Sequence, residues 1–149
     1  MVHELHFLRE ALREAEKAFS HGEVPVGALV VKEGRIISRA FNRKEFLQDP
    51  TAHAEVIAIR EASRRLNSWR LTGCTLYTTV EPCIMCAGAI IQSRVERVVY
   101  SVADPKFGGV ESLFRILSDG RVNHRPEVVK IELPEAARLL REFFELLRS

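Results

Sequence analysis

Two short motifs carry the residue types best suited to metal chemistry. They are His53-Ala54-Glu55 and Pro82-Cys83-Ile84-Met85-Cys86, and each lies where a loop-like stretch meets a helical pattern. Imidazole nitrogen and thiolate sulfur are ligands that suit zinc. We therefore expect His53, Cys83 and Cys86 to hold one Zn²⁺ ion.

The spacing within each motif restricts where these residues can sit. Cys83 and Cys86 are three positions apart, so their side chains share one face of a helix. His53 and Glu55 are two positions apart and would point about 200° away from each other in mid-helix. They can serve one site only at the start of a helix, where partial positive charge also favours thiolates. Both motifs are therefore predicted to sit at helix N-termini.

Three protein ligands leave the fourth tetrahedral position of zinc open, which is typical of a catalytic site. Zinc lowers the pKa of a bound water, and a carboxylate outside the ligand shell can take that proton and pass it to a substrate. Glu55 is the candidate for this task. The third cysteine, Cys74, lies in an apolar strand pattern and is interpreted as a core residue.

Hydrophobic periodicity predicts the elements that must position these motifs. The expected helices are residues 3–20, 52–66 and 82–92 (with Pro82 as the first residue), a short one at 112–117, and a last one from Pro134. The expected strands are residues 24–31, 35–41, 74–79, 95–102 and 128–133, with a tight turn at 32–35 and loops at 42–52 and 104–109. This order indicates an α/β fold, a three-layer α/β/α sandwich with a five-stranded mixed sheet. Its first strand pair should be antiparallel and its later pairs parallel.

Length, composition and charge limit the number of domains, the cellular location and the possible partners. A chain of 149 residues with 46% hydrophobic and 28% charged residues suits a single globular domain, expected to span residues 1–149. Three cysteines make a complete disulfide framework improbable. The chain shows neither a membrane-span pattern nor a secretory signal, so a cytoplasmic location and no membrane partner are expected. A net charge of +2 neither requires nor excludes a nucleic-acid partner.

Taken together, the motifs resemble a known family. The order H-x-E…P-C-x-x-C is the signature of zinc-dependent nucleobase deaminases. Further matching positions identify the chain as similar to the bacterial tRNA-specific adenosine deaminases of the cytidine deaminase-like superfamily. These positions are residues 23–28, 42, 49–55, 76–89, 93–94, 104–106 and 123–125, so the resemblance covers nearly the whole chain.

The resemblance implies a reaction and a set of contacts. The wobble adenosine of a tRNA anticodon, usually that of an arginine tRNA, would be hydrolysed to inosine with release of ammonia. Glu55 would be the catalytic residue, and the family is usually a homodimer that binds the tRNA anticodon stem-loop with both subunits. The residues that the resemblance implies for substrate binding are Asn42, Ala54, Arg70, Arg94, Asp104, Lys106, Asn123, His124, Phe144 and Arg148.

Two other readings stay open from the sequence. A deaminase of free guanine, cytosine or cytidine would keep the metal chemistry and change only the pocket. A zinc-stabilised RNA-binding module without catalysis would need neither Glu55 nor an open fourth position, so the motif favours an enzyme. Phe143 and Phe144 are adjacent on a helix and point about 100° apart, so one can serve the core while the other faces a partner.

Overall fold

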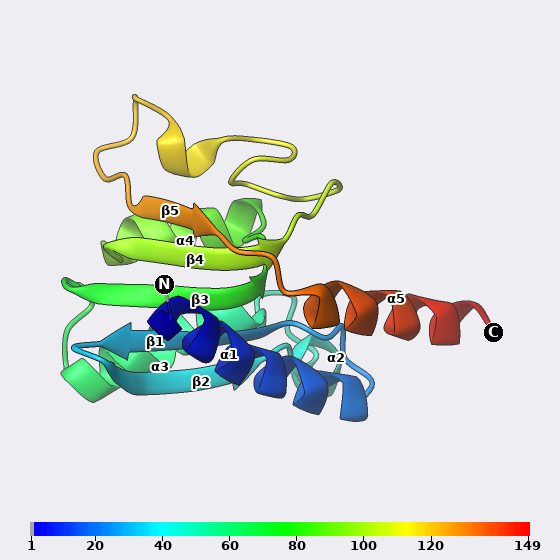
Figure 1. Ribbon diagram of the computed structural model, residues 1–149. Coiled ribbons are helices and arrows are strands. Elements are labelled where there is room, and N and C mark those ends of the chain that lie inside the picture. The colour runs from blue at the N-terminus through cyan, green and yellow to red at the C-terminus, as the bar shows by residue number, and fades with distance from the viewer. Residues whose placement is uncertain (1) are drawn as a thin grey trace.

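The computed structural model describes residues 2–149. One five-stranded sheet has the strand order β2-β1-β3-β4-β5 (Figure 1). Its central strand β3 is antiparallel to β1, which is also antiparallel to β2, whereas β3, β4 and β5 run parallel. The strands are β1 (Gly27–Lys32), β2 (Arg35–Phe41), β3 (Cys74–Val80), β4 (Arg97–Val102) and β5 (Glu127–Lys130). The predicted mixed sheet is confirmed.

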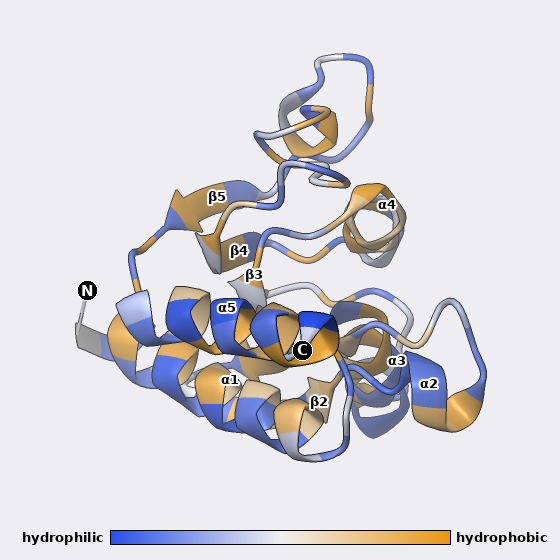
Figure 2. Ribbon diagram, turned by 90° about the vertical axis from the view of Figure 1, so that its right-hand side faces the viewer, coloured by the Kyte–Doolittle hydropathy of each residue, from blue (hydrophilic) through white to orange (hydrophobic). Residues whose placement is uncertain are grey.

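Helices cover both faces of this sheet. The helices α1 (Val2–Ser20) and α5 (Pro134–Arg148) lie together on one face, and α3 (Ala54–Leu66) and α4 (Ile84–Ser93) lie on the other (Figures 1 and 2). The three-layer α/β/α sandwich is therefore confirmed. No helix among residues 2–149 combines the length and apolar character needed to cross a membrane.

The alternation of side chains along β1 divides the core between the two faces. Leu29 and Val31 pack with Phe7 of α1, whereas Ala28 and Val30 join the cluster that includes residues of α3 and α4. All four are buried, as expected for a strand that is covered on both sides. Burying a side chain such as Leu or Val is worth about 1.5–3 kcal/mol, so β1 anchors both helical layers.

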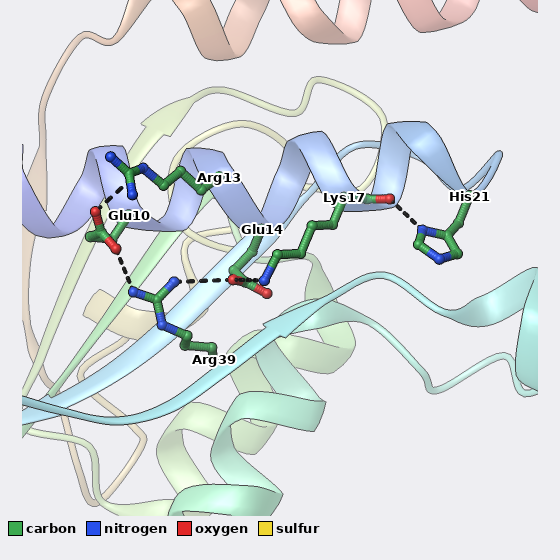
Figure 3. A network of polar contacts seen from close by, with 6 residues as sticks. All are labelled: Glu10, Arg13, Glu14, Lys17, His21 and Arg39. Atoms are coloured by element: carbon green, nitrogen blue, oxygen red, sulfur yellow. Dashed lines mark hydrogen bonds and ion pairs between the residues drawn. The ribbon is translucent and has the colours of Figure 1, made fainter.

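A network of polar contacts ties α1 to the edge strand β2 (Figure 3). Arg39 pairs with both Glu10 and Glu14, and Lys17 Nζ lies 2.8 Å from Glu14 Oε2. His21 Nδ1 lies 2.7 Å from the carbonyl oxygen of Lys17 and so continues the helix end. Glu14 is buried, so its carboxylate requires the charges of Arg39 and Lys17 as partners, and the network orients α1 along β2.

The first strand begins three residues later than predicted, at Gly27 instead of Val24. Pro25 has no N–H to donate to a neighbouring strand, and Val26 N–H is turned back to Val24 O. Gly27 is then required by the approach of α1, because a Cβ atom there would lie 2.0 Å from the carbonyl oxygen of Ala11. The predicted turn is confirmed, with Glu33 and Gly34 at positive φ.

Two predictions near the motifs need correction. Residues 42–52 are not all loop, because the short helix α2 (Lys44–Leu47) forms where the Glu23 carboxylate accepts the N–H groups of Glu45 and Phe46. Pro82 is not the first residue of α4, which begins at Ile84 with Cys83 as its N-cap.

Two predictions after β4 also need correction. The expected helix at 112–117 shrinks to a 3-10 turn, η1 (Ile116–Ser118), because residues 110–114 donate their N–H groups to the Glu81 carboxylate and to the Gly108 carbonyl oxygen. The last strand covers Glu127–Lys130 instead of 128–133, since the Leu133 N–H bonds to the Ser101 hydroxyl and leaves the ladder.

Candidate active site

The three predicted metal ligands meet at the N-terminal ends of α3 and α4. His53 is the N-cap of α3, Cys83 is the N-cap of α4, and Cys86 lies in the first turn of α4. His53 Nδ1 is 3.6 Å from the Sγ atom of each cysteine. The prediction that both motifs sit at helix starts is therefore confirmed.

The geometry of this cluster fits zinc. A tetrahedral ion with Zn–S bonds of about 2.3 Å and a Zn–N bond of about 2.0–2.1 Å would hold nitrogen and sulfur about 3.5–3.6 Å apart. The two N–S separations match that value, and all three ligand atoms lie within 4.8 Å of one another. Within residues 2–149 the cluster contains three ligands, which leaves a tetrahedral ion one position for water or substrate.

Electrostatics at the cluster favours a bound cation. A hydrogen bond from Cys86, helped by His53, lowers the pKa of Cys83 to about 4, while the same bond raises the pKa of Cys86. The contact with Cys83 raises the pKa of His53. The three side chains thus compete for protons within one cluster. A divalent cation bound to the cluster would release protons from its ligands.

Glu55 lies in the first turn of α3 and is 4% exposed. Burial raises its pKa to about 7, although the nearby His53 acts in the opposite direction. A carboxylate with a pKa near neutrality can both accept and donate a proton at physiological pH. It touches the cluster through Cys86 without being one of the three ligands.

Asn42 and Ala54 are brought together, in a manner that the sequence did not predict. The Ala54 N–H donates a hydrogen bond to Asn42 Oδ1, with an N–O distance of 2.8 Å. This N–H orients the Asn42 side chain, so it is not available to donate a hydrogen bond to a substrate base. Asn42 keeps its amide NH₂ as a donor beside the start of α3.

The loops after β4 and before β5 carry four predicted RNA contacts. Asp104 Oδ1 accepts the N–H groups of Lys106 and Phe107, which leaves the Lys106 side chain exposed. Asn123 is exposed, whereas His124 Nε2 lies 2.6 Å from the carbonyl oxygen of Val95. His124 is therefore anchored to the fold.

The other four predicted contacts lie on helices or directly after them. Arg70 stacks on Trp69 after α3, and Arg94 caps the end of α4 with a bond to Ile91 O. Both follow the C-terminal ends of helices whose N-terminal ends hold the cluster, so one chain does not bring them to the metal ligands. In α5, Phe144 is 42% exposed and Arg148 is exposed, whereas Phe143 is buried and lies 6.0 Å from Phe19 between ring centroids.

The residue that the sequence analysis missed is Glu81, directly before Pro82 and Cys83. It is 1% exposed, and its carboxylate accepts the N–H groups of Asp104, Val110, Glu111 and Ser112. Although burial alone would raise the pKa of Glu81, these bonds hold it below its usual range. The loop of residues 104–112 is thereby fastened beside the metal cluster.

The same loop is joined to α4 through its backbone. Gly108 pairs with Cys83, and the Ile84 N–H donates to the carbonyl oxygen of Phe107. A Cβ atom on Gly108 would lie 2.3 Å from Glu81 Oε2, so only glycine fits there. The glycine at 108, four residues after Asp104, was the one sequence signal for this contact.

An α/β/α sandwich with a His-Cys-Cys cluster and a buried glutamate at two helix starts is the arrangement of zinc-dependent nucleobase deaminases. The model of the family described as "Cytidine and deoxycytidylate deaminase zinc-binding region" matches residues 1–102. Zinc is thus the cofactor that both the family and the cluster geometry indicate.

Similar proteins show to which branch of the deaminases the chain is most alike. The tRNA-specific adenosine deaminase of Aquifex aeolicus (strain VF5) is 57% identical over 144 residues, which cover 97% of this chain and 95% of that protein. That of Bacillus subtilis (strain 168) is 49% identical over 144 residues, covering 96% and 89%. The chain therefore belongs to the zinc-binding cytidine and deoxycytidylate deaminase family, in the branch of the tRNA-specific adenosine deaminases.

Solved structures agree with this assignment. A structure from studies of A-to-I editing by tRNA:A34 deaminases superposes with a TM-score of 0.82 at 46% identity, covering 85% of this chain and 98% of that one. A guanine deaminase from Nitrosomonas europaea has a TM-score of 0.79 at 26% identity, covering 91% and 81%. The fold is shared by both, and the higher identity lies with the tRNA deaminase.

Proposed function

We propose that this protein converts the wobble adenosine of a tRNA anticodon, in particular that of an arginine tRNA, to inosine and ammonia. The observation that carries the proposal is the meeting of His53, Cys83 and Cys86 with the buried Glu55 at two helix starts. Relatives with up to 57% identity over nearly the whole chain bear the name of this activity. We take residues 1–149 as one deaminase domain.

The metal would be held by His53 Nδ1 and by the Sγ atoms of Cys83 and Cys86. When bound, Zn²⁺ supplies a water molecule of lowered pKa for attack on the carbon that bears the amine. The two helix N-termini favour the thiolate form of the cysteines because of their partial positive charge. Two thiolates also offset the charge of the divalent ion.

Glu55 would move the protons of the reaction. It takes one proton from the attacking water and delivers it to the adjacent ring nitrogen. It then takes the remaining proton of the added hydroxyl group and delivers it to the amine, so that the C–N bond breaks, the carbonyl group forms and ammonia leaves. Its raised pKa of about 7 suits both steps, because the carboxylate must be a base first and an acid afterwards. Burial keeps bulk water from competing for these protons.

Asn42 would hold the base through its side-chain NH₂ group. The Ala54 N–H acts as the positioning group, because its bond to Asn42 Oδ1 sets which end of the amide faces outward. An adenosine stacked in an RNA helix cannot reach this site, whereas the splayed bases of an anticodon loop can.

The remaining contacts would position the RNA around the base. Asp104 and Lys106 would border the site from the loop after β4, and Phe144 and Arg148 would extend the RNA-binding surface along α5. His124 is bonded to the carbonyl oxygen of Val95, one residue after Arg94, so Asn123 and His124 would meet the RNA beside Arg94. Lys106 and Arg148 are exposed cations that suit phosphate groups. With a tRNA substrate, the reaction would take place in the cytoplasm.

A homodimer would complete this surface. Arg70 and Arg94 lie at the helix ends remote from the cluster, so their contact with the same RNA requires a second subunit. A groove between α3 and α4 offers an apolar face for that subunit, and it is lined by Ile59, Trp69 and Ala89 among others. Trp69 is 59% exposed in the single chain.

A direct assay separates this function from its relatives. The protein is incubated with an anticodon stem-loop RNA and, in parallel, with free adenosine, guanine, cytosine and cytidine, and the released ammonia is measured. We expect ammonia from the stem-loop alone. Turnover of the free compounds without turnover of the stem-loop would replace the proposal by that of a free-base or nucleoside deaminase.

A further inference from the structure

A column of stacked side chains lines the end of β2 and the short helix α2. The His21 ring lies 5.5 Å from the Phe41 ring between centroids, with 31° between their planes. The Arg43 guanidinium follows, 5.3 Å from the centroid of Phe41 and 5.6 Å from that of Phe46. Phe46 ends the column and is 70% exposed, the highest value among the large apolar side chains described.

The backbone that presents Phe46 is anchored. The Glu23 carboxylate, 2% exposed, accepts the N–H groups of Glu45 at 3.0 Å and of Phe46 at 2.7 Å. The Arg43 N–H donates to the carbonyl oxygen of Ala52 at 3.0 Å. A buried carboxylate is stable only with such partners, so the backbone that carries the exposed Phe46 ring is fixed to the fold.

The column borders the metal cluster. Phe41 and Arg43 flank Asn42, whose Oδ1 accepts the N–H of Ala54, the residue after the ligand His53. In Figure 2, α2 and the start of α3 lie side by side on the face that is turned toward the viewer. The segment that carries the column is therefore hydrogen-bonded to the residues on either side of His53, through Arg43 to Ala52 and through Asn42 to Ala54.

We propose that Phe46 and Arg43 form a stacking platform for an unpaired RNA base that neighbours the deaminated adenosine, an inference that rests on the proposed function. Aromatic rings and guanidinium planes are the groups on which proteins stack splayed bases. The Arg43 guanidinium lies within cation–π distance of both rings, and its charge, with that of Lys44, suits the adjoining phosphates. A purely apolar contact with a protein would need no cation inside the column.

Binding of a fluorescently labelled anticodon stem-loop tests the platform. Phe46→Ala should weaken binding about 5- to 100-fold, the range that corresponds to loss of one stacked base, and Phe46→Trp should bind within about 3-fold of the unchanged protein because it keeps an aromatic face. Leu47→Ala is the matched control, since Leu47 is an exposed neighbour on α2 outside the column. Equal affinity of Phe46→Ala and the unchanged protein, or an equal loss in Leu47→Ala, would overturn the platform.

Abasic stem-loops locate the partner base. When the stacked base is removed from the RNA, Phe46→Ala should cause no further loss, whereas it should keep its full effect at other positions. An effect that stays the same in every abasic RNA would overturn stacking. A shift of Phe46→Ala from dimer to monomer in sedimentation, without a stacking signature, would assign Phe46 to contacts between copies instead.

Inosine formation by the unchanged protein distinguishes failure of the proposed function from failure of the stacking platform. If it forms no inosine in the stem-loop, the proposed function fails and the platform with it. If it forms inosine at a normal rate while Phe46→Ala binds RNA with unchanged affinity, the platform alone is overturned.

Discussion

At the residue scale, Glu55 is a buried carboxylate that lies beside the three predicted metal ligands. Its predicted role depends on the side chain being a carboxylate and not merely polar. Glutamine has nearly the same shape and can fill the same space, but it cannot carry a proton between water and substrate. The Glu55→Gln variant therefore separates chemistry from packing.

We expect Glu55→Gln to bind one zinc per chain and to remain folded, while its rate of inosine formation falls by about 10²- to 10⁴-fold or more. Zinc is measured by elemental analysis, and inosine by nucleoside chromatography. Inosine formation by Glu55→Gln at the unchanged rate would show that the proton shuttle is another group.

Cys83→Ala should behave in the opposite way. It removes a ligand with a lowered pKa, so zinc content should fall well below one per chain and thermal stability should fall with it. The Glu55→Gln protein is the matched control, because it alters the same site without removing a ligand. Full zinc occupancy in Cys83→Ala would contradict the ligand assignment.

The metal residues could be predicted because their signal is local. Two short motifs have fixed spacings, and the placement of both at helix starts follows from helix geometry. Glu81 could not be found this way, since its partners lie 23 to 31 positions further along the chain. The Ala54 N–H was missed as the partner of Asn42 for the same reason: the contact joins the residue after β2 to the first residue of α3, 12 positions further along the chain.

At the element scale, the loop of residues 104–112 depends on one buried carboxylate. Both Glu81 oxygens accept bonds from this loop, so Glu81→Gln replaces an acceptor by an NH₂ group that faces other donors. An unsatisfied buried group costs about 1–3 kcal/mol.

Glu81→Gln should keep zinc, lose about 1–3 kcal/mol of stability and show faster amide exchange in residues 104–112. Its KM for the stem-loop should rise more than its kcat falls, because the loop positions Asp104 and Lys106 and not the proton shuttle. Glu23→Gln is the control: it also loses a buried carboxylate, but its faster exchange should be confined to α2. Unchanged exchange in the loop of Glu81→Gln would contradict this role.

The types and the order of the helices and strands could be predicted from hydrophobic periodicity, whereas the residues at which several of them begin and end could not. The strand expected at Val24 begins at Gly27, because α1 approaches that backbone closely. The helices at 44–47 and 116–118 differ from prediction because the carboxylates of Glu23 and Glu81 take the local N–H groups. Such tertiary hydrogen bonds leave no periodic trace in the sequence.

At the scale of the whole molecule, acidic side chains join distant elements. Glu4 of α1 accepts a hydrogen bond from the Tyr77 hydroxyl of β3 and pairs with Arg97 of β4. The bond from Arg97 holds the pKa of Glu4 below its ordinary value of 4.5, against the opposing effect of burial. The folded state therefore binds fewer protons at this group than the unfolded state does.

Stability should fall as the pH drops. A group with a lowered pKa in the folded state contributes stability above its unfolded value of 4.5, and that contribution is lost as the pH falls through the folded value. Glu4→Gln should thus be less stable than the unchanged protein at pH 7, and the difference should shrink below pH 4.5. Denaturant titrations across this range measure it, and a difference that does not change with pH would contradict the assignment.

The layered fold was predictable because strand and helix periods alternate along the chain. The groove between α3 and α4 was not predictable, because the sequence alone does not show which apolar side chains of these helices lie in the core and which lie at the surface. Arg70 and Arg94 are an example: the family resemblance implies that they contact RNA together with the other predicted residues, whereas the fold puts them after the ends of α3 and α4 that are remote from the metal cluster.

Sequencing of cDNA from tRNA treated with the purified protein tests the central claim most directly. Inosine is copied as guanosine, so the wobble adenosine of the arginine tRNA should read as guanosine after treatment and as adenosine after treatment with Glu55→Gln. An unchanged adenosine at that position, with zinc bound and the protein folded, would contradict the account.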